Sequence, residues 1–138
     1  MSKLNTGPIQ HLVLTVSDLQ RSRRFYTEVL HFEVAAEIPR ANRIMMSNGT
    51  LILGIGLPFD PSQTPTFDRF SEHRMGLDHL SIAVENRAEM EKALAIFEEH
   101  QVPHGEIEDL SPLGFPRLVL AFRDPDNIQL ELTTAISA

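Results

Sequence analysis

Two histidines in matching sequence surroundings are the first residues of this chain whose types and pattern could do chemistry. His11 opens residues 11–16 and His79 opens residues 79–84. In both stretches apolar residues alternate with smaller or polar ones, which predicts a strand with one apolar face and one face that carries the histidine. A strand of this kind lines a cavity more readily than a solid core.

A carboxylate near the C-terminal end of the sequence fits the same pattern. Residues 128–133 are predicted to form the closing strand, with Glu131 on the face opposite the apolar side chains. Two neutral imidazoles and one carboxylate that face inward can hold a divalent metal and leave coordination positions open for water or substrate. We therefore predict a metal site made of His11, His79 and Glu131.

Each of these three residues also has an ordinary structural interpretation. A single strand histidine is more often a hydrogen-bonded structural group than a ligand, and a glutamate near the end of a chain is usually solvated. The other histidines show no such placement, and we assign them to helix ends and loops: His31, His73, His100 and His104.

Composition limits the possible classes of function. The 138 residues suffice for one domain, and the formal net charge of −7 argues against a nucleic-acid-binding surface. There is no cysteine, so a metal must be held by His, Asp or Glu. No stretch reads as a signal peptide or a membrane span. We expect a cytoplasmic protein with a small-molecule substrate and without nucleic-acid or membrane partners.

The elements that must position these residues are predicted to follow the order βαβββ twice. Asp18 and Asn86 are the predicted N-caps of two helices that reach about residues 31 and 101. Strands are predicted over residues 9–16, 32–38, 43–47 and 50–57, and then over 77–84, 102–107, 117–123 and 128–133.

The two halves are related by one offset. A shift of 68 residues pairs His11 with His79 and Asp18 with Asn86, which indicates an internal duplication. The predicted fold class is α+β: two repeated βαβββ modules that form a cupped, barrel-like mixed sheet with the helices outside. In this interpretation residues 1–138 are a single domain, with modules at about 8–57 and 76–134 and a linker or lid at about 58–75.

Three motifs in the expected order resemble a known family. Residues 9–22, followed by Phe25-Tyr26 and Val29-Leu30, resemble the opening of the vicinal oxygen chelate superfamily. This group contains glyoxalase I, bleomycin-resistance proteins and extradiol dioxygenases. Residues 76–80 and 122–132 resemble its second-module strand and its closing motif.

The resemblance implies metal ligands at His11, His79 and Glu131, with Fe, Mn, Zn, Ni or Co as the ion. It also implies a homodimer that acts on a small oxygenated substrate by dioxygenase-like or Lewis-acid lyase or transferase chemistry. The family position of a fourth, carboxylate ligand falls on Gly54 or a close neighbour, where no acid stands, and no catalytic residue is assigned.

The alternative is a non-catalytic small-molecule or drug-binding protein of the bleomycin-resistance type. In either case Gly54 and Gly56 leave room in the cavity. The expected polar lining consists of Thr15, Ser81, Gln129 and Thr133.

Overall fold

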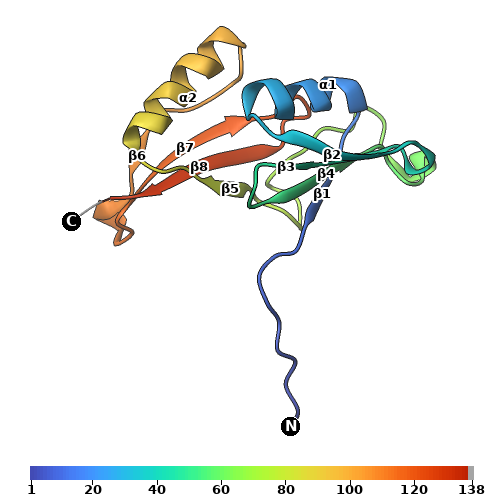
Figure 1. The fold of residues 1–138 in the computed structure, drawn as a ribbon, viewed down its shortest axis with the longest axis horizontal. Coiled ribbons are helices and arrows are strands. Elements are labelled where there is room, and N and C mark those ends of the chain that lie inside the picture. The colour runs from blue at the N-terminus through green and yellow to red at the C-terminus, as the bar shows by residue number, and fades with distance from the viewer. Residues whose placement is uncertain (137–138) are drawn as a thin grey trace. The chain divides into compact units, whose positions relative to one another are not determined.

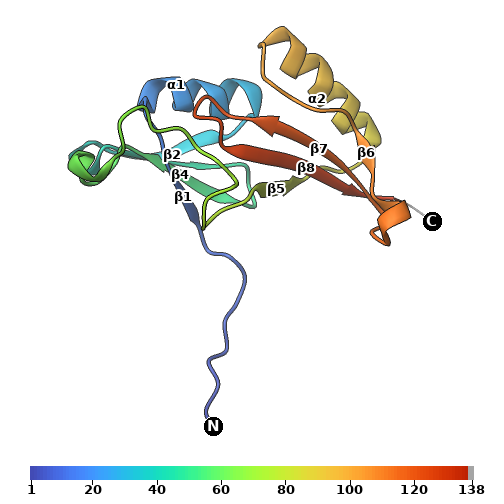
Figure 2. The same ribbon diagram turned by 180° about the vertical axis from the view of Figure 1, so that it is seen from behind.

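A computed structural model describes residues 1–136 and divides the chain into two compact units, Met1–Thr64 and Pro65–Ala138 (Figures 1 and 2). Each unit has the order βαβββ and one four-stranded mixed sheet, so the predicted α+β class and the repeated element order are confirmed. The boundary between the units falls inside the segment 58–75 that the sequence marks as a linker.

The first unit begins with strand β1 and helix α1, and Asp18 starts the helix as predicted: its Oδ1 accepts a hydrogen bond of 3.0 Å from the backbone N–H of Arg21. Its sheet has the order β1-β4-β3-β2, in which β1 runs parallel to β4 and the other pairs are antiparallel. The elements are β1 (Leu12–Thr15), α1 (Leu19–Arg24) with a π-helical continuation (Phe25–Val29), β2 (Glu33–Ile38), a 3₁₀ turn (Pro39–Ala41), β3 (Arg43–Ser47), β4 (Ile52–Gly56) and a 3₁₀ turn (Pro61–Gln63).

The second unit repeats this layout. Asn86 caps helix α2, since its Oδ1 accepts a hydrogen bond of 3.0 Å from the N–H of Glu89. Its sheet has the order β5-β8-β7-β6, and β5 runs parallel to β8. The elements are β5 (Leu80–Ala83), α2 (Arg87–Glu99), β6 (Glu108–Asp109), a 3₁₀ turn (Ser111–Leu113), β7 (Arg117–Arg123) and β8 (Gln129–Ala135).

In each unit the helix covers the apolar face of its own sheet (Figures 1 and 2). In the second unit Phe97 of α2 stacks on Phe122 of β7, with ring centroids 4.5 Å apart, and both side chains are buried. In the first unit Leu53 and Ile55 of β4 are fully buried. Side chains alternate along a strand, so the predicted site residues lie on the opposite face of each sheet, away from the helix.

The duplication is visible in the strand registers. Four successive rows of three residues cross β1, β4 and β3, and four equivalent rows cross β5, β8 and β7. In the first unit they are Leu12/Leu53/Met46, Val13/Gly54/Met45, Leu14/Ile55/Ile44 and Thr15/Gly56/Arg43. In the second they are Leu80/Leu130/Phe122, Ser81/Glu131/Ala121, Ile82/Leu132/Leu120 and Ala83/Thr133/Val119. The first and third rows of each sheet are apolar, and the second and fourth face away from the helix.

The prediction of a strand over residues 102–107 was wrong. Only an isolated bridge between His104 and Phe122 forms there, and the short strand β6 comes later, at Glu108–Asp109. Pro103 has no N–H to donate to a ladder, which limits the pairing of this segment with β7. Among the described residues, every helix is too short or too polar to cross a bilayer.

Candidate metal centre

His79 stands just before β5, and a neighbouring carboxylate fixes its ring. Its Nδ1 lies 2.7 Å from Oδ1 of Asp78. An ionised carboxylate can only accept, so Nδ1 donates this hydrogen bond and, in the neutral ring, Nε2 carries the lone pair. Nε2 lies 3.9 Å from Oε2 of Glu131. The two predicted ligands of the second unit are thus adjacent, each with a metal-binding atom turned toward the other.

Glu131 sits on β8 between Ser81 of β5 and Ala121 of β7. Its Oε1 accepts hydrogen bonds from the hydroxyls of Ser81, at 2.8 Å, and Thr133, at 2.9 Å. These two bonds hold one carboxylate oxygen and leave Oε2 directed at His79. The carboxylate side chain is 21% exposed and the imidazole 41%, so the pair is open to a ligand.

A second layer of hydrogen bonds supports Asp78. The side-chain N–H of Gln129 donates to Oδ1 and to the backbone carbonyl of Asp78, both at 3.1 Å. The guanidinium of Arg123 donates in turn to Oε1 of Gln129 at 3.3 Å. Arg123 therefore reaches His79 through two intermediate side chains.

Arg123 also binds the end of the predicted linker. Its Nη1 and Nη2 donate to the two carboxylate oxygens of Glu72, both at 2.8 Å. This bidentate pair lowers the pKa of Glu72 from 4.5 to about 2, mainly because the guanidinium donates to the ionised carboxylate. The backbone N–H of Phe70 donates to the carbonyl of Asp126, and the side chain of Asn127 donates back to the carbonyl of Phe70, both at 3.1 Å. Residues 70–72 are thus tied to the β7–β8 turn of their own unit.

His11 shows the same local arrangement in the first unit. It precedes β1, and its Nδ1 contacts Oε1 of Gln10, so Nε2 is again the nitrogen left for a ligand. His11 lies in the other compact unit, and its convergence with His79 and Glu131 stays a prediction. Among residues 1–136, no three His, Asp or Glu side chains form a ready metal-binding group.

Gly54 occupies the row position in the first sheet that Glu131 occupies in the second. A Cβ at Gly54 would lie 2.7 Å from Sδ of Met45 and 3.0 Å from a methyl of Val13. Met45 thus fills the space where a second carboxylate would stand. The structure agrees with the sequence that strand β4 supplies no acid.

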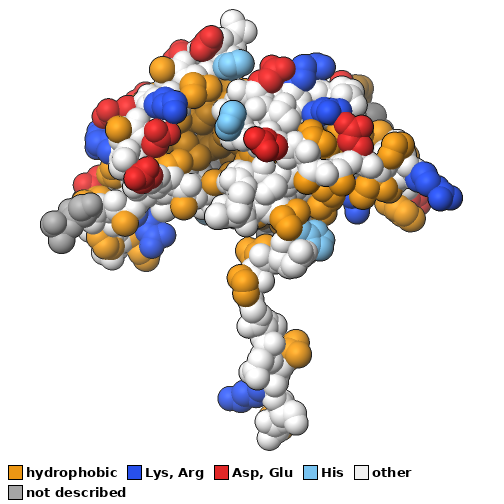
Figure 3. Space-filling view, viewed as in Figure 1, with side chains coloured by type: hydrophobic (Ala, Val, Ile, Leu, Met, Phe, Trp, Pro, Cys, Tyr) orange, Lys and Arg blue, Asp and Glu red, His pale blue; other side chains and the backbone are white. Residues whose placement is uncertain are grey.

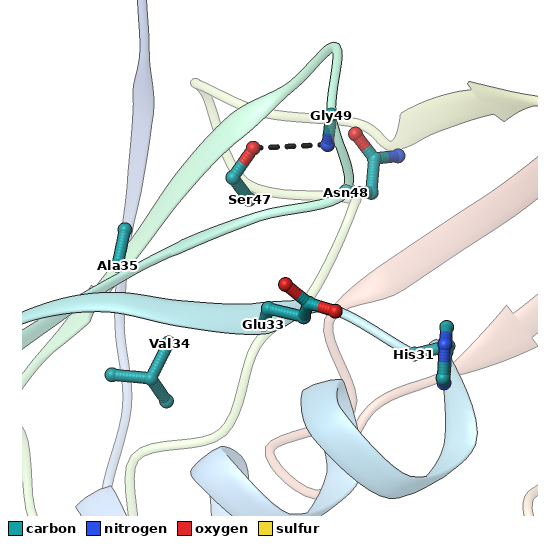
Figure 4. A pocket seen from close by; sticks show the side chains of 7 residues that line it. All are labelled: His31, Glu33, Val34, Ala35, Ser47, Asn48 and Gly49. Atoms are coloured by element: carbon teal, nitrogen blue, oxygen red, sulfur yellow. Dashed lines mark hydrogen bonds between the residues drawn. The ribbon is translucent and has the colours of Figure 1, made fainter.

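A separate hollow of about 350 Å³ lies in the first unit, where the Ser47–Asn48–Gly49 hairpin end faces His31 and Glu33 (Figure 4). His31 follows the helix with a φ of 59°, as expected for a residue at a helix end. None of the three predicted ligands lines this hollow.

The supporting residues were missed by the sequence interpretation. Gln10 and Asp78 had no assigned role. Each directly precedes its histidine and carries a side-chain oxygen, and this pattern in the sequence could have predicted a hydrogen bond to the ring. Ser81, Gln129 and Thr133 were expected only as cavity lining, whereas in the structure they position Glu131 and Asp78.

Known proteins match this chain over almost its whole length. A family model described as Glyoxalase/Bleomycin resistance protein/Dioxygenase superfamily matches residues 8–132. The uncharacterized protein YaeR of Escherichia coli strain K12 is 27% identical over 135 residues, which cover 94% of this chain and 97% of YaeR.

Solved structures with the same fold include a glyoxylase/bleomycin resistance protein/dioxygenase domain from Frankia sp. EAN1pec. Its TM-score is 0.79 at 26% identity, covering 97% of this chain and 96% of that one. Lactoylglutathione lyase from Agrobacterium tumefaciens matches with a TM-score of 0.69 at 20% identity, covering 93% of each chain. The second match shows the fold alone.

Proposed function

Because the chain belongs to the Glyoxalase/Bleomycin resistance protein/Dioxygenase superfamily, we propose that it is a metal-dependent enzyme that acts on a small oxygenated substrate. His11, His79 and Glu131 would hold a divalent ion through the two Nε2 atoms and Oε2. The observation that carries the proposal is the pair of His79 and Glu131, 3.9 Å apart on the face of the sheet away from α2.

The donor atoms of this pair fit such an ion. An imidazole nitrogen and a carboxylate oxygen are donor atoms that divalent ions of this kind accept. Both side chains are partly exposed, so an ion could reach them.

When bound, the metal would act as a Lewis acid on adjacent oxygens of the substrate. The side chains of Gln10 and Asp78 hold the Nδ1–H tautomer, and the hydroxyls of Ser81 and Thr133 orient the carboxylate of Glu131. Since Gly54 provides neither a fourth ligand nor a base, we favour chemistry that needs three protein ligands, of the dioxygenase or Lewis-acid lyase or transferase type.

The proposal is tested by elemental analysis of untagged protein purified without chelators, followed by titration with Fe, Mn, Zn, Ni and Co. We expect one ion per site, and a loss of binding in Glu131→Ala and His79→Ala. Glu108→Ala, which changes an exposed acid of β6, is the matched control. A wild-type protein that binds none of these ions at neutral pH would contradict the proposal. If one of the ions binds, the loaded protein is screened for activity on small oxygenated substrates.

A non-catalytic, drug-binding role of the bleomycin-resistance type is the second candidate. It is favoured by Met45, whose side chain covers Gly54 where a catalytic carboxylate could have stood. A protein that binds small molecules equally well with and without metal would support this role.

We also propose a homodimer. Both β1 and β5 lie at the edge of their sheets, where unpaired backbone groups invite further pairing. Residues 1–11 are exposed and include the apolar side chains of Leu4 and Ile9. Figure 3 shows hydrophobic side chains along this N-terminal stretch. Sedimentation equilibrium tests this expectation, and a monomer at all concentrations would contradict it.

A further inference from the structure

Arg43 carries a guanidinium that the protein leaves without a partner. It is the first residue of β3 and lies on the face of its sheet that points away from α1. Its Nε is buried, and among the described residues nothing accepts a hydrogen bond from the side chain or forms an ion pair with it. Burying an N–H donor without an acceptor is unfavourable, so such groups usually have a reason.

The other half-buried arginines of the described chain are paired. Arg23 contacts Glu37 at 2.7 Å, and Arg123 binds both oxygens of Glu72. The chain has 19 acidic residues against 12 lysines and arginines, so a shortage of carboxylates does not explain the unpaired state of Arg43.

The sheet makes room for this side chain at one residue. Gly56 faces Arg43 across β3 and β4, and a Cβ on Gly56 would lie 3.1 Å from Nε and 3.6 Å from Nη2. The guanidinium therefore lies close over Gly56 of β4. At the equivalent row of the second unit the residues are Thr133 and Val119, so the cation and its glycine occur together in the first unit only.

We propose that Arg43 binds an oxyanion group of the substrate, a carboxylate or a phosphate-like group. A guanidinium presents a planar fork of N–H donors that matches such groups with two hydrogen bonds. The row that holds Arg43 also contains Thr15, which lies four residues beyond His11 along the chain. With the rise along a strand and the spacing between strands, the anion would lie roughly 15 Å from that histidine. This proposal extends the proposed function by naming an anionic group of the substrate. That the anion belongs to a substrate rests on the proposed function.

The test is a titration of ¹⁵N-labelled full-length protein with inorganic phosphate and, separately, with acetate, each against sodium chloride at the same ionic strength. We expect a saturable shift of the Arg43 Nε–H signal and of the Thr15 and Gly56 amides with at least one of the two anions. A response to phosphate alone or to acetate alone identifies the group. Shifts no larger than those with chloride would overturn the proposal.

Three variants sharpen the test. Arg43→Gln is expected to weaken the anion binding reported by the Thr15 and Gly56 amides about tenfold or more. Arg40→Gln, which changes an exposed arginine three residues earlier, is expected to leave it unchanged. Gly56→Ala keeps every charge but displaces the guanidinium, and we expect it to weaken binding as well. Unchanged binding in Arg43→Gln would overturn the proposal.

The same titration on chelator-treated and Mn²⁺-treated protein separates the two proposals. Anion binding without any uptake of metal would leave the Arg43 site standing and contradict the metal-dependent function. Uptake of metal without a response at Arg43 would support the metal-dependent function and contradict the Arg43 site.

Discussion

Gly54 and Glu131 occupy equivalent positions in the two sheets, and the sizes of their neighbours are reversed. Gly54 lies between Val13 and Met45, whereas Glu131 lies between Ser81 and Ala121. A large side chain on β3 thus accompanies a glycine on β4, and a small residue on β7 leaves space for the carboxylate on β8. The two modules have the same architecture, but at this position only the second has an acidic side chain.

Gly54→Ala is expected to destabilise the protein, because its Cβ would lie 2.7 Å from Sδ of Met45. Overpacking of this kind costs about 1–3 kcal/mol, and we expect the lower end since the Met45 side chain is flexible. In the double variant Gly54→Ala/Met45→Ala the clash with Met45 is absent, and only the 3.0 Å approach to the methyl of Val13 remains. The two changes should therefore be non-additive by about 0.5 kcal/mol or more in urea denaturation.

Gly7→Ala is the matched control for this cycle, since nothing lies within 4 Å of a Cβ at Gly7. It is expected to leave the free energy of unfolding unchanged. Additive effects of the Gly54 and Met45 substitutions would show that the glycine at position 54 and the large side chain at position 45 are not energetically coupled.

Asp78→Ala is expected to weaken metal binding about 10–100-fold while the three ligands remain. Without the carboxylate at Nδ1, the ring of His79 loses both its fixed tautomer and its orientation toward Glu131. Isothermal titration with Mn²⁺ measures the effect. The control is Asp68→Ala, which removes an exposed aspartate that pairs with Arg74. Equal affinities of Asp78→Ala and the wild type would show that Asp78 does not support the site.

The sequence predicted the fold wherever a local period or cap determines it. The strands β3 and β7 match their predicted bounds, and Asp18 and Asn86 cap the helices as expected, because alternation and capping are properties of neighbouring residues. The failure at 102–107 has the same origin: apolar residues favour a strand there, while Pro103 limits the pairing.

The candidate site was predictable only in part. Face alternation and the repeat placed His79 and Glu131 on one side of the second sheet, and the structure brings them together. The pairing of Glu72 with Arg123, 51 residues apart, leaves no local pattern in the sequence. The unpaired state of Arg43 is equally invisible, since it depends on which acids fold toward other partners.

Glu72→Gln is expected to release residues 70–72 from the β7–β8 turn. The carboxylate has its pKa lowered from 4.5 to about 2 by Arg123, so the ion pair contributes its full stability above pH 4.5 and loses it as the pH falls toward 2. In the variant this contribution is missing at every pH. Hydrogen exchange of the Phe70 amide, which donates to Asp126, should be faster in the variant at pH 6 and similar in both proteins near pH 2.

The matched control replaces Asp68, which pairs with Arg74 in the same segment, by Asn. Both side chains of that pair are substantially exposed, so its loss should leave exchange at Phe70 unchanged. Equal protection of Phe70 in wild-type protein and Glu72→Gln at pH 6 would show that the hydrogen bonds of Phe70 with Asp126 and Asn127 hold the segment without the ion pair.

His104 is expected to make the stability of the second unit depend on pH. Its Nδ1 lies 2.6 Å from the carbonyl of Gly105 and its Nε2 lies 2.7 Å from Oε1 of Glu98 on α2, and both partners are acceptors. The bond to Gly105, the bond to Glu98 and the nearby charge of Glu106 raise the pKa of His104 above 6.5, although burial against Phe97 opposes this. Both nitrogens can donate only in the protonated ring.

A raised pKa in the folded state fixes the sign of the pH dependence. The contribution of His104 is fully present below pH 6.5 and is lost as the pH rises through the raised value. In Glu98→Gln the neutral amide no longer attracts the imidazolium, so urea denaturation should show a smaller loss of stability between pH 6 and 9 than in the wild type. Glu99→Gln, the next residue of α2, should behave as the wild type does. If the free energy of unfolding changed equally between pH 6 and 9 in all three proteins, the charge of His104 would not contribute to holding α2 against the segment that follows it.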